Sequence, residues 1–285
     1  MVARTLHSDL APRLEPDGSW SLRPEHDRVL VTGGGSGIGR ALTLALAGMG
    51  VTTYILGRTE ATLVETARLA EDLPGRIVPI RCDLRDETDA DTAFERIEDD
   101  GGPVQSLAHC AASVYTASAR AITVDGFRKV VDSTLVAAFI TISRFARPLL
   151  DSKVGGTVVS LTSNSASAGA AGVAHSGAGK AGLESLTMTL AREWGPSGIR
   201  INAIGPGPFP VENSVEGLTR PAVLEHLQRT TPLGRLGRIE EVVGPILFFL
   251  SPLSGYTSGQ VLVCDGGRRT LDWVIPPDLQ PPDWR

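Results

Sequence analysis

The stretch that most constrains the fold is "VLVTGGGSGIGRALTLALAGMG", which begins at Val29. A short β-branched run, a turn of glycines and an apolar helical pattern follow one another in it. Gly33 permits a tight exit from the strand, Gly37 lets the backbone approach a pyrophosphate, and Gly39 lets helix and strand pack closely. The amides and positive dipole end of the helix then face the phosphates of a dinucleotide. The residues predicted to bind it are Gly33, Ser36, Gly37, Ile38 and Gly39.

Short apolar runs recur along the rest of the chain, and longer helical patterns such as "EATLVETARLAEDL" separate them. The predicted strands are Val29–Thr32, Val51–Leu56, Arg76–Arg81, Ser106–Ala108, Thr157–Leu161, Arg200–Ile204 and Val261–Cys264. Strands that are apolar throughout are typical of parallel sheets covered on both faces. The alternation predicts an α/β fold with one doubly wound parallel sheet of about seven strands.

No internal repeat or long linker divides the chain, so we expect one domain over residues 28–267. Residues 1–27 form a polar, proline-containing extension. Residues 205–222, rich in Pro and Gly, follow a strand and are predicted to form a substrate loop. Residues 268–285 cannot continue a helix and are expected to run over the surface or onto a neighbouring subunit.

Composition excludes several classes of protein. The net charge of −5 gives no excess of positive charge of the kind that binds nucleic acid or an anionic membrane. No apolar run reaches the roughly 18 to 20 residues that span a bilayer, and no secretory signal is recognisable. The three cysteines match no metal spacing and no disulfide framework, which favours reduced thiols and a cytoplasmic location, with no metal site.

The second predicted strand ends in "YILGRTE", where an NAD site would carry a carboxylate for the ribose hydroxyls. Arg58 stands there instead. A guanidinium suits a 2′-phosphate, which an acidic side chain would repel. The sequence therefore predicts NADP(H) as the cofactor.

With these motifs the chain resembles the short-chain dehydrogenase/reductase family, which has the Rossmann fold. "TGGGSGIG" is similar to the family's cofactor loop, and "CDLRDE" resembles its adenine-contacting segment, with Asp83 and Leu84 at the contacting positions. "GIRINAIGPGP" places Pro206 and Gly207 on the nicotinamide side. "SGQVLVCDGG" resembles the closing strand that helps to build dimers or tetramers, so the resemblance implies a homodimer or homotetramer.

Several positions depart from the family's pattern. The "NNAG" motif reads "HCAA", with Ala111 in a cofactor-binding position, and the active-site asparagine falls on Thr134. The YxxxK motif reads Ser176-x-x-x-Lys180, and Ser163 lies 13 residues before Ser176, at the separation that the family's catalytic serine requires. Of the asparagine, serine, tyrosine and lysine set, only Ser163 and Lys180 remain.

The resemblance implies that Lys180 binds the nicotinamide ribose, a role that needs no tyrosine. Ser176 is a far weaker acid than a phenol with a pKa of about 10. We therefore expect an NADPH-dependent reductase of a small organic substrate that takes its proton from water, from the substrate or from another residue. Ser163, Ser176 and Lys180 are its predicted catalytic residues, and Tyr115 is a fourth candidate.

One alternative is a conjugated enone or an enoyl or dienoyl thioester, in which hydride adds to carbon and the charge spreads into an enolate. A narrower resemblance to 2,4-dienoyl-CoA reductases, which also carry a small residue in place of the tyrosine, supports it. Those enzymes have an extra acidic or phenolic helper, which neither Thr134 nor Ser165 supplies.

The other alternative is a carbonyl substrate, as in a ketoreductase, with Tyr115 or His175 as the proton donor. A different class also stays open: a pseudo-enzyme, or a non-redox catalyst of cyclisation or dehydration that keeps the cofactor loop. Consumption of NADPH in the presence of substrate separates these classes.

Overall fold

The computed structural model describes residues 21–210 and 220–268, and within them the strands form one parallel seven-stranded sheet. The strands lie in the order β3-β2-β1-β4-β5-β6-β7, so the chain builds outwards from β1 in one direction and then from β4 in the other. Their bounds are β1 Arg28–Thr32, β2 Thr52–Gly57, β3 Ile77–Arg81, β4 Ser106–His109, β5 Gly156–Leu161, β6 Ile199–Pro206 and β7 Val261–Cys264. The predicted doubly wound α/β fold is confirmed.

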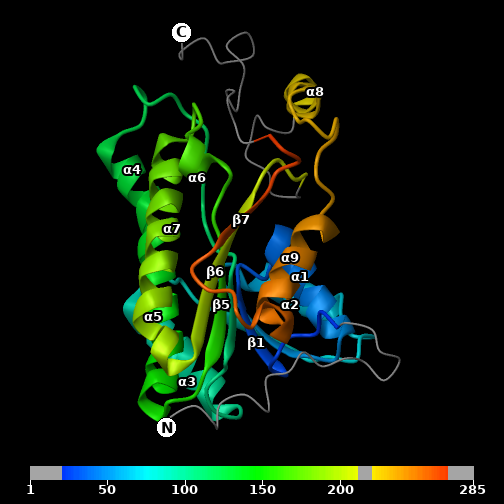
Figure 1. The fold of residues 1–285 in the computed structure, drawn as a ribbon, viewed down its shortest axis with the longest axis vertical. Helices are drawn as coiled ribbons and strands as arrows, with labels where there is room; N and C mark the ends of the chain where they lie inside the picture. The colour runs from blue at the N-terminus through cyan, green and yellow to red at the C-terminus, as the bar shows by residue number, and fades with distance from the viewer. Residues whose placement is uncertain (1–20, 211–219, 269–285) are drawn as a thin grey trace.

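Helices cover both faces of the sheet, with α4, α5 and α7 on one side and α1, α2 and α9 on the other (Figure 1). The α-helices are α1 Gly37–Gly48, α2 Glu60–Arg68, α3 Glu87–Asp99, α4 Val124–Val131, α5 Ala137–Ser152, α6 Ser165–Ala168, α7 Ala174–Trp194, α8 Pro221–Arg229 and α9 Glu240–Leu250. A π-helical turn, η1 Asp132–Val136, joins α4 to α5, and two 3₁₀ turns are η2 Gly195–Ser197 and η3 Pro252–Ser254.

Alternate residues of each strand supply two separate cores. Leu30 packs into the cluster under α3, α5 and α7, whereas its neighbours Val29 and Val31 pack under α1, α2 and α9. The period of two along a strand sends successive side chains to opposite faces. A sheet with helices on both faces therefore needs strands that are apolar on both sides. The ends of the predicted strands lie within two residues of the observed ends.

Helix α2 is shorter than its sequence pattern, which runs on to Leu73. It ends at Arg68, and the following residues form turns in which the amide of Leu73 bonds to the carbonyl of Ala70. Pro74 accounts only for the break at Leu73, because the residue before a proline is driven away from helical backbone angles.

One helical stretch among the described residues, Val124–Ser152, has the length and apolar composition to cross a membrane. The sequence had led us to expect none. Half of its most apolar window is buried, and Ile142, Phe145 and Leu149 of this stretch belong to the core against the sheet. We therefore interpret it as a core helix.

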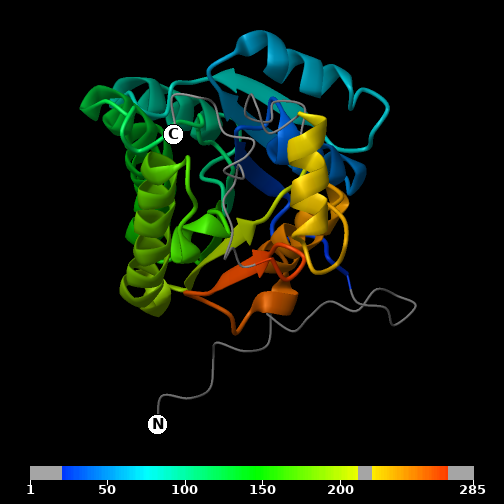
Figure 2. The same cartoon turned by 90° about the horizontal axis from the view of Figure 1, so that it is seen from above.

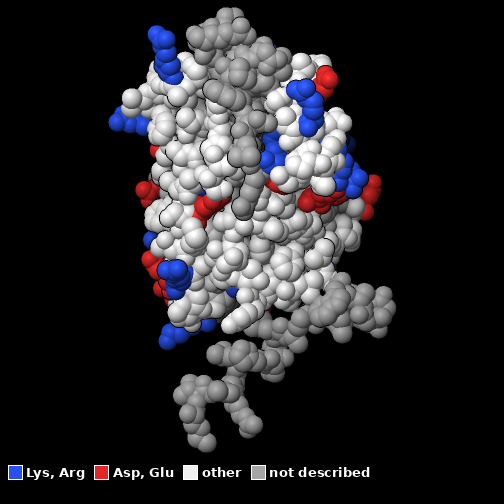
Figure 3. Space-filling view, turned by 45° about the horizontal axis from the view of Figure 1, so that its top comes forward, with Lys and Arg blue, Asp and Glu red and all other residues white. Residues whose placement is uncertain are grey.

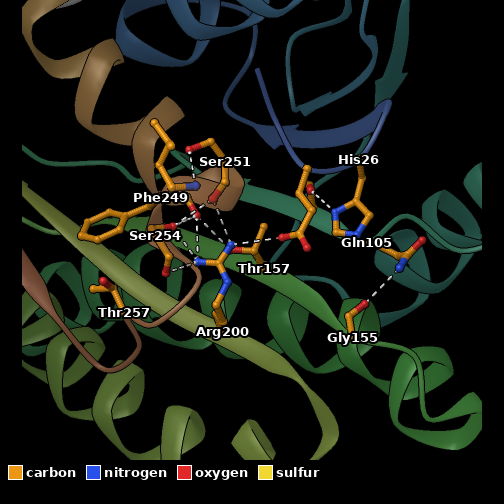
Figure 4. A network of polar contacts seen from close by, with 12 residues as sticks. His26, Gln105, Gly155, Thr157, Arg200, Phe249, Ser251, Ser254 and Thr257 are labelled. Carbon is orange, nitrogen blue, oxygen red and sulfur yellow. Dashed lines mark hydrogen bonds and ion pairs between the residues drawn. The ribbon is translucent and has the colours of Figure 1, made fainter. Parts of the chain in front are cut away.

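At the amino ends of the strands, Arg200 of β6 joins the sheet to the end of α9 (Figure 4). Its guanidinium donates to the carbonyl oxygens of Phe249, Ser251 and Ser254 and forms an ion pair with Glu25, at 3.3 Å. The side chain of Arg200 is 13% exposed. This cation is surrounded by acceptors and ties residues 21–27 to the domain.

The predicted divisions of the chain meet the structure only in part. Residues 1–20 of the extension, 211–219 of the substrate loop and 269–285 of the tail lie outside the described residues. The elements from β1 to β7 span residues 28–264. The three cysteines are free thiols, with Cys82 buried and the other two half-buried.

Candidate functional site

The carboxyl ends of the strands, the upper edge in Figure 1 and the edge seen from above in Figure 2, carry the predicted site. The glycine turn leaves β1 there. Gly33 has a φ of +69°, and a Cβ on Gly39 would lie 2.3 Å from the carbonyl oxygen of Gly33. Ser36, which precedes α1, makes no side-chain cap bond. A backbone cradle with uncapped amides fits the pyrophosphate of a dinucleotide.

A cleft of about 270 Å³ extends from this cradle across the ends of β1, β2, β3 and β4. The predicted cofactor residues in its wall are Gly33, Ser36, Arg58, Asp83, Leu84 and Ala111. Gly37, Ile38 and Gly39 form the first turn of α1. Three other predicted cofactor residues are not among the described residues that line this cleft. They are Lys180 of α7, Pro206 at the end of β6, and Gly207, which follows β6.

Arg85 also lines the cleft and forms an ion pair with Asp83 through two hydrogen bonds. Its Nε lies 2.9 Å from Oδ1 of Asp83, and its second guanidinium nitrogen lies 2.5 Å from Oδ2. Hydrogen bonds from the Arg85 side chain, its backbone amide and the charge of Arg58 lower the pKa of Asp83 to about 2. Sequence reasoning missed Arg85, although its i, i+2 spacing from Asp83 was the available signal.

Lys180 projects from α7 and donates to the carbonyl oxygen of Leu161, the last residue of β5. It is 6% exposed, and burial lowers its pKa to about 8. The resemblance implies that Lys180 binds a nicotinamide ribose. Leu161 takes one of the three donors of the ammonium within the folded chain, so a ribose is not the only partner of this lysine.

Ser176 lies one helical turn before Lys180 and is 9% exposed. Within the part of the chain that the structure describes, no residue forms a hydrogen bond with its hydroxyl. Ser163 pairs with Ser165 at 2.9 Å between hydroxyl oxygens, and α6 packs against α7 so that the Ser165 carbonyl faces Gly177. The fold therefore brings Ser163, Ser176 and Lys180 to one region, as the resemblance implies.

Tyr115, the candidate proton donor, lies in the loop after β4 and meets the ring of His175 edge to face, with centroids 4.3 Å apart. A Cβ on Gly126 would lie 2.5 Å from the Tyr115 hydroxyl oxygen, so this hydroxyl lies against the first turn of α4. His175 is fully buried, and burial lowers its pKa. Tyr115 therefore packs between His175 and the start of α4, and His175 stays neutral near pH 7.

Thr134 lies in the π-helical turn η1, a kind of turn that is common at functional sites. It is fully buried, and its hydroxyl has no partner within the described part of the chain. A Cβ on Gly179 of α7 would lie 3.2 Å from Thr134 side-chain atoms. Glycine in the middle of α7 therefore allows the close approach of η1, which outweighs its lower helix propensity.

His109, at the end of β4, is a second residue that the motif comparison undervalued. It is fully buried, its Nδ1 lies 3.2 Å from the hydroxyl of Thr32, and burial followed by the charge of Lys180 lowers its pKa to about 3. His109 is therefore a neutral neighbour of Lys180. A neutral imidazole of this kind cannot supply the acid.

The comparisons with known proteins agree with this geometry. A family model described as enoyl-(acyl carrier protein) reductase matches residues 33–269. A probable 2,4-dienoyl-CoA reductase of Bacillus subtilis is 33% identical over 88% of this chain and 98% of its own length. The peroxisomal 2,4-dienoyl-CoA reductase of Mus musculus is 33% identical over 83% and 82%, respectively.

Solved structures are similar throughout the domain. A short-chain dehydrogenase from Bacillus anthracis superposes with a TM-score of 0.82 at 29% identity, covering 89% of this chain and all of that one. RhlG of Pseudomonas aeruginosa, determined as a complex with NADP, superposes with a TM-score of 0.79 at 27% identity, covering 85% and 96%.

Proposed function

Since the chain belongs to the short-chain dehydrogenase/reductase family of oxidoreductases, we propose that it reduces a carbon–carbon double bond conjugated to a thioester, with NADPH as the reductant. The observation that carries the proposal is the pair Ser176 and Lys180. The lysine stays buried at the site, while the phenol expected four residues before it is replaced by a hydroxyl without a partner in the described chain. The similarity to 2,4-dienoyl-CoA reductases supports this substrate class.

The residues present fit a nicotinamide dinucleotide. The cradle at Gly33 and Gly39 and the uncapped start of α1 would hold the pyrophosphate, and Arg58 in the wall of the cleft would hold a 2′-phosphate. When bound, the nicotinamide supplies the hydride. Lys180 would hold the adjoining ribose with the donors that Leu161 leaves over.

A conjugated thioester makes a weak acid sufficient. Negative charge that develops on its carbonyl oxygen is spread over an enolate, so hydrogen bonds stabilise it without proton transfer to oxygen. Ser163, Ser176 and the Lys180 ammonium supply such donors. The proton that carbon takes up comes from water at the hydroxyl of Ser176, where the missing phenol leaves room.

The geometry supports the carbonyl alternative less well. Reduction of a ketone ends in an alkoxide, which needs a stronger acid nearby. The Tyr115 hydroxyl lies against Gly126, and His175 is buried and neutral. His175 therefore does not carry the proton that such an acid must give up, and the Tyr115 hydroxyl packs against the first turn of α4.

Two assays test the proposal. We expect a 2,4-dienoyl-CoA or 2-enoyl-CoA to cause loss of NADPH absorbance, and a panel of ketones to cause none. Faster turnover of a ketone would move the protein to the carbonyl class. Tight NADPH binding with no consumption by any substrate would make it a pseudo-enzyme and overturn the proposal.

The variant Ser176→Tyr sharpens the same test. A phenol at position 176 fills the space that we assign to water and substrate, so turnover of the thioester should fall about 10-fold or more at unchanged NADPH affinity. Ser176→Ala is the matched control and should lose less. Activity that first appears in Ser176→Tyr would show that the natural chain is not a reductase.

We also propose a cytoplasmic homo-oligomer. The turn η1 and the helices α5 and α7 expose apolar side chains, among them Val136 (41%), Phe139 (50%) and Met188 (47%). On the face drawn in Figure 3, charged side chains of both signs lie interspersed, with uncharged surface between them. A second copy suits an apolar helical face of this kind, and a monomer mass in solution would argue against it.

A further inference from the structure

The cofactor cleft contains a carboxylate where the proposed cofactor brings a phosphate. Asp83 and Arg58 both line it. With its pKa lowered to about 2, Asp83 is ionised throughout the working range of pH. An unpaired carboxylate there would offset the charge of Arg58 and repel a 2′-phosphate. Neutralisation of Asp83 would therefore favour a 2′-phosphorylated cofactor in this cleft.

We propose that Arg85 is that group: by pairing with Asp83 it leaves the charge of Arg58 unopposed and so sets the preference for a 2′-phosphorylated cofactor. The inference rests on the proposed use of NADPH. It assigns to Arg85 a specificity-determining role that acts through Asp83, not through the reacting atoms.

The pair is held in place by its surroundings. Arg85 reaches Asp83 with two guanidinium nitrogens, and its backbone amide adds a bond to Oδ1 at 3.2 Å. The amide of Asp83 is bonded to Oδ2 of Asp89 in the first turn of α3, at 3.0 Å. The two guanidinium bonds and the backbone bonds on either side hold this partly exposed pair in one geometry, unlike a pair joined by a single bond between two long, mobile side chains.

Strand β3 also provides a matched control. Arg76, next to its other end, pairs with Asp100 at 2.6 Å, a distance close to the 2.5 Å of the Arg85–Asp83 pair. Arg76 does not line the cleft. Arg76→Gln thus removes an equivalent ion pair beside the same strand and leaves the charges of the cleft unchanged.

The test uses the full chain and ligands that cannot react. Dissociation constants are measured by calorimetry for adenosine 2′,5′-bisphosphate and for 5′-AMP, and their ratio gives the preference for a 2′-phosphate. In Arg85→Gln this preference should fall about fivefold, the effect of one partly screened charge across the cleft, and the fall should shrink at high salt. NADPH and NADH should give the same pattern.

The double variant separates neutralisation from direct contact. If Arg85 acts by neutralising Asp83, then Asp83→Asn together with Arg85→Gln restores the preference to within about twofold, since both charges are gone. Arg85→Lys should keep most of it. If the double variant stays as poor as Arg85→Gln, Arg85 touches the phosphate itself and the inference is wrong.

Arg58→Gln distinguishes this failure from failure of the proposed cofactor. If Arg58→Gln leaves the preference unchanged, NADPH is not the selected cofactor and the proposed function loses its support. Arg58→Gln could abolish the preference for a 2′-phosphate while Arg85→Gln and Arg76→Gln both leave it intact. That result would contradict the role proposed for Arg85 and leave the proposed use of NADPH standing. Far-UV circular dichroism of each variant confirms that the chain has folded.

Discussion

Two buried cations lie at opposite ends of the strands of this sheet, and the number of acceptors around them differs. Arg200, at the amino edge, donates to three carbonyl oxygens and faces the carboxylate of Glu25. Lys180, at the carboxyl edge, has one acceptor among the described residues, the carbonyl of Leu161. Its neighbours His109 and Cys110 are uncharged, since burial lowers the pKa of the histidine and raises that of the thiol.

The difference separates a structural cation from a functional one. The donors of Arg200 are taken up by the protein, so its charge holds the chain together and is available for nothing else. Lys180 keeps two donors for a ligand, while its burial is compensated by a single bond. An under-satisfied buried cation beside a cleft is a mark of a binding or catalytic site.

Replacement of Lys180 should give the largest effect of all. Lys180→Met removes the cation that we propose to hold the ribose and the developing enolate, so kcat/KM should fall about 100- to 1,000-fold. The chain should nevertheless fold at least as stably as the wild type, because a poorly compensated charge leaves the interior. Steady-state kinetics and thermal unfolding measure the two sides. A strong loss of stability would make Lys180 a structural residue like Arg200.

Replacement of Arg200 should give the opposite pattern. Arg200→Met leaves Glu25 without its ion-pair partner and removes the guanidinium donor from three carbonyl oxygens, which should lower the free energy of unfolding by about 3 kcal/mol. The kcat of the folded fraction should stay near that of the wild type, because the network lies at the far edge of the sheet (Figure 4). Denaturant titration with activity at low temperature measures both. A loss of kcat without a loss of stability would contradict the comparison.

The pH dependence should give the smallest effect. As the pH rises through about 8, Lys180 in the folded, cofactor-free chain loses its proton, so kcat/KM for NADPH should fall about tenfold for each further pH unit. The folded pKa is below the unfolded value of 10.5, so the unfolded chain binds more protons between these values. This group's contribution to stability therefore rises with pH from about 8 to 10.5.

Lys180→Arg is the control for this prediction, because a guanidinium stays protonated over the whole range. Its residual activity should show no falling limb near pH 8. A limb that persists in Lys180→Arg would belong to another group and would remove the pH argument for Lys180.

The sequence by itself determined the fold and the position of the cleft. The glycine turn after Val29–Thr32 and the evenly apolar strands are local patterns, and local backbone sterics and strand periodicity are enough to interpret them. The serine at position 176 and the arginine at position 58 are visible in the same way. Each of these conclusions depends on one short segment.

Only the tertiary structure decided which groups meet. That Leu161 takes a bond from Lys180, that Gly126 receives the hydroxyl of Tyr115, and that Arg85 turns back onto Asp83 all depend on packing or on side-chain direction. Most such contacts join segments that are distant in the chain, and several orientations of the same side chain satisfy the local pattern equally well. The choice between them is made by burial and by hydrogen bonding, which exist only in the folded chain.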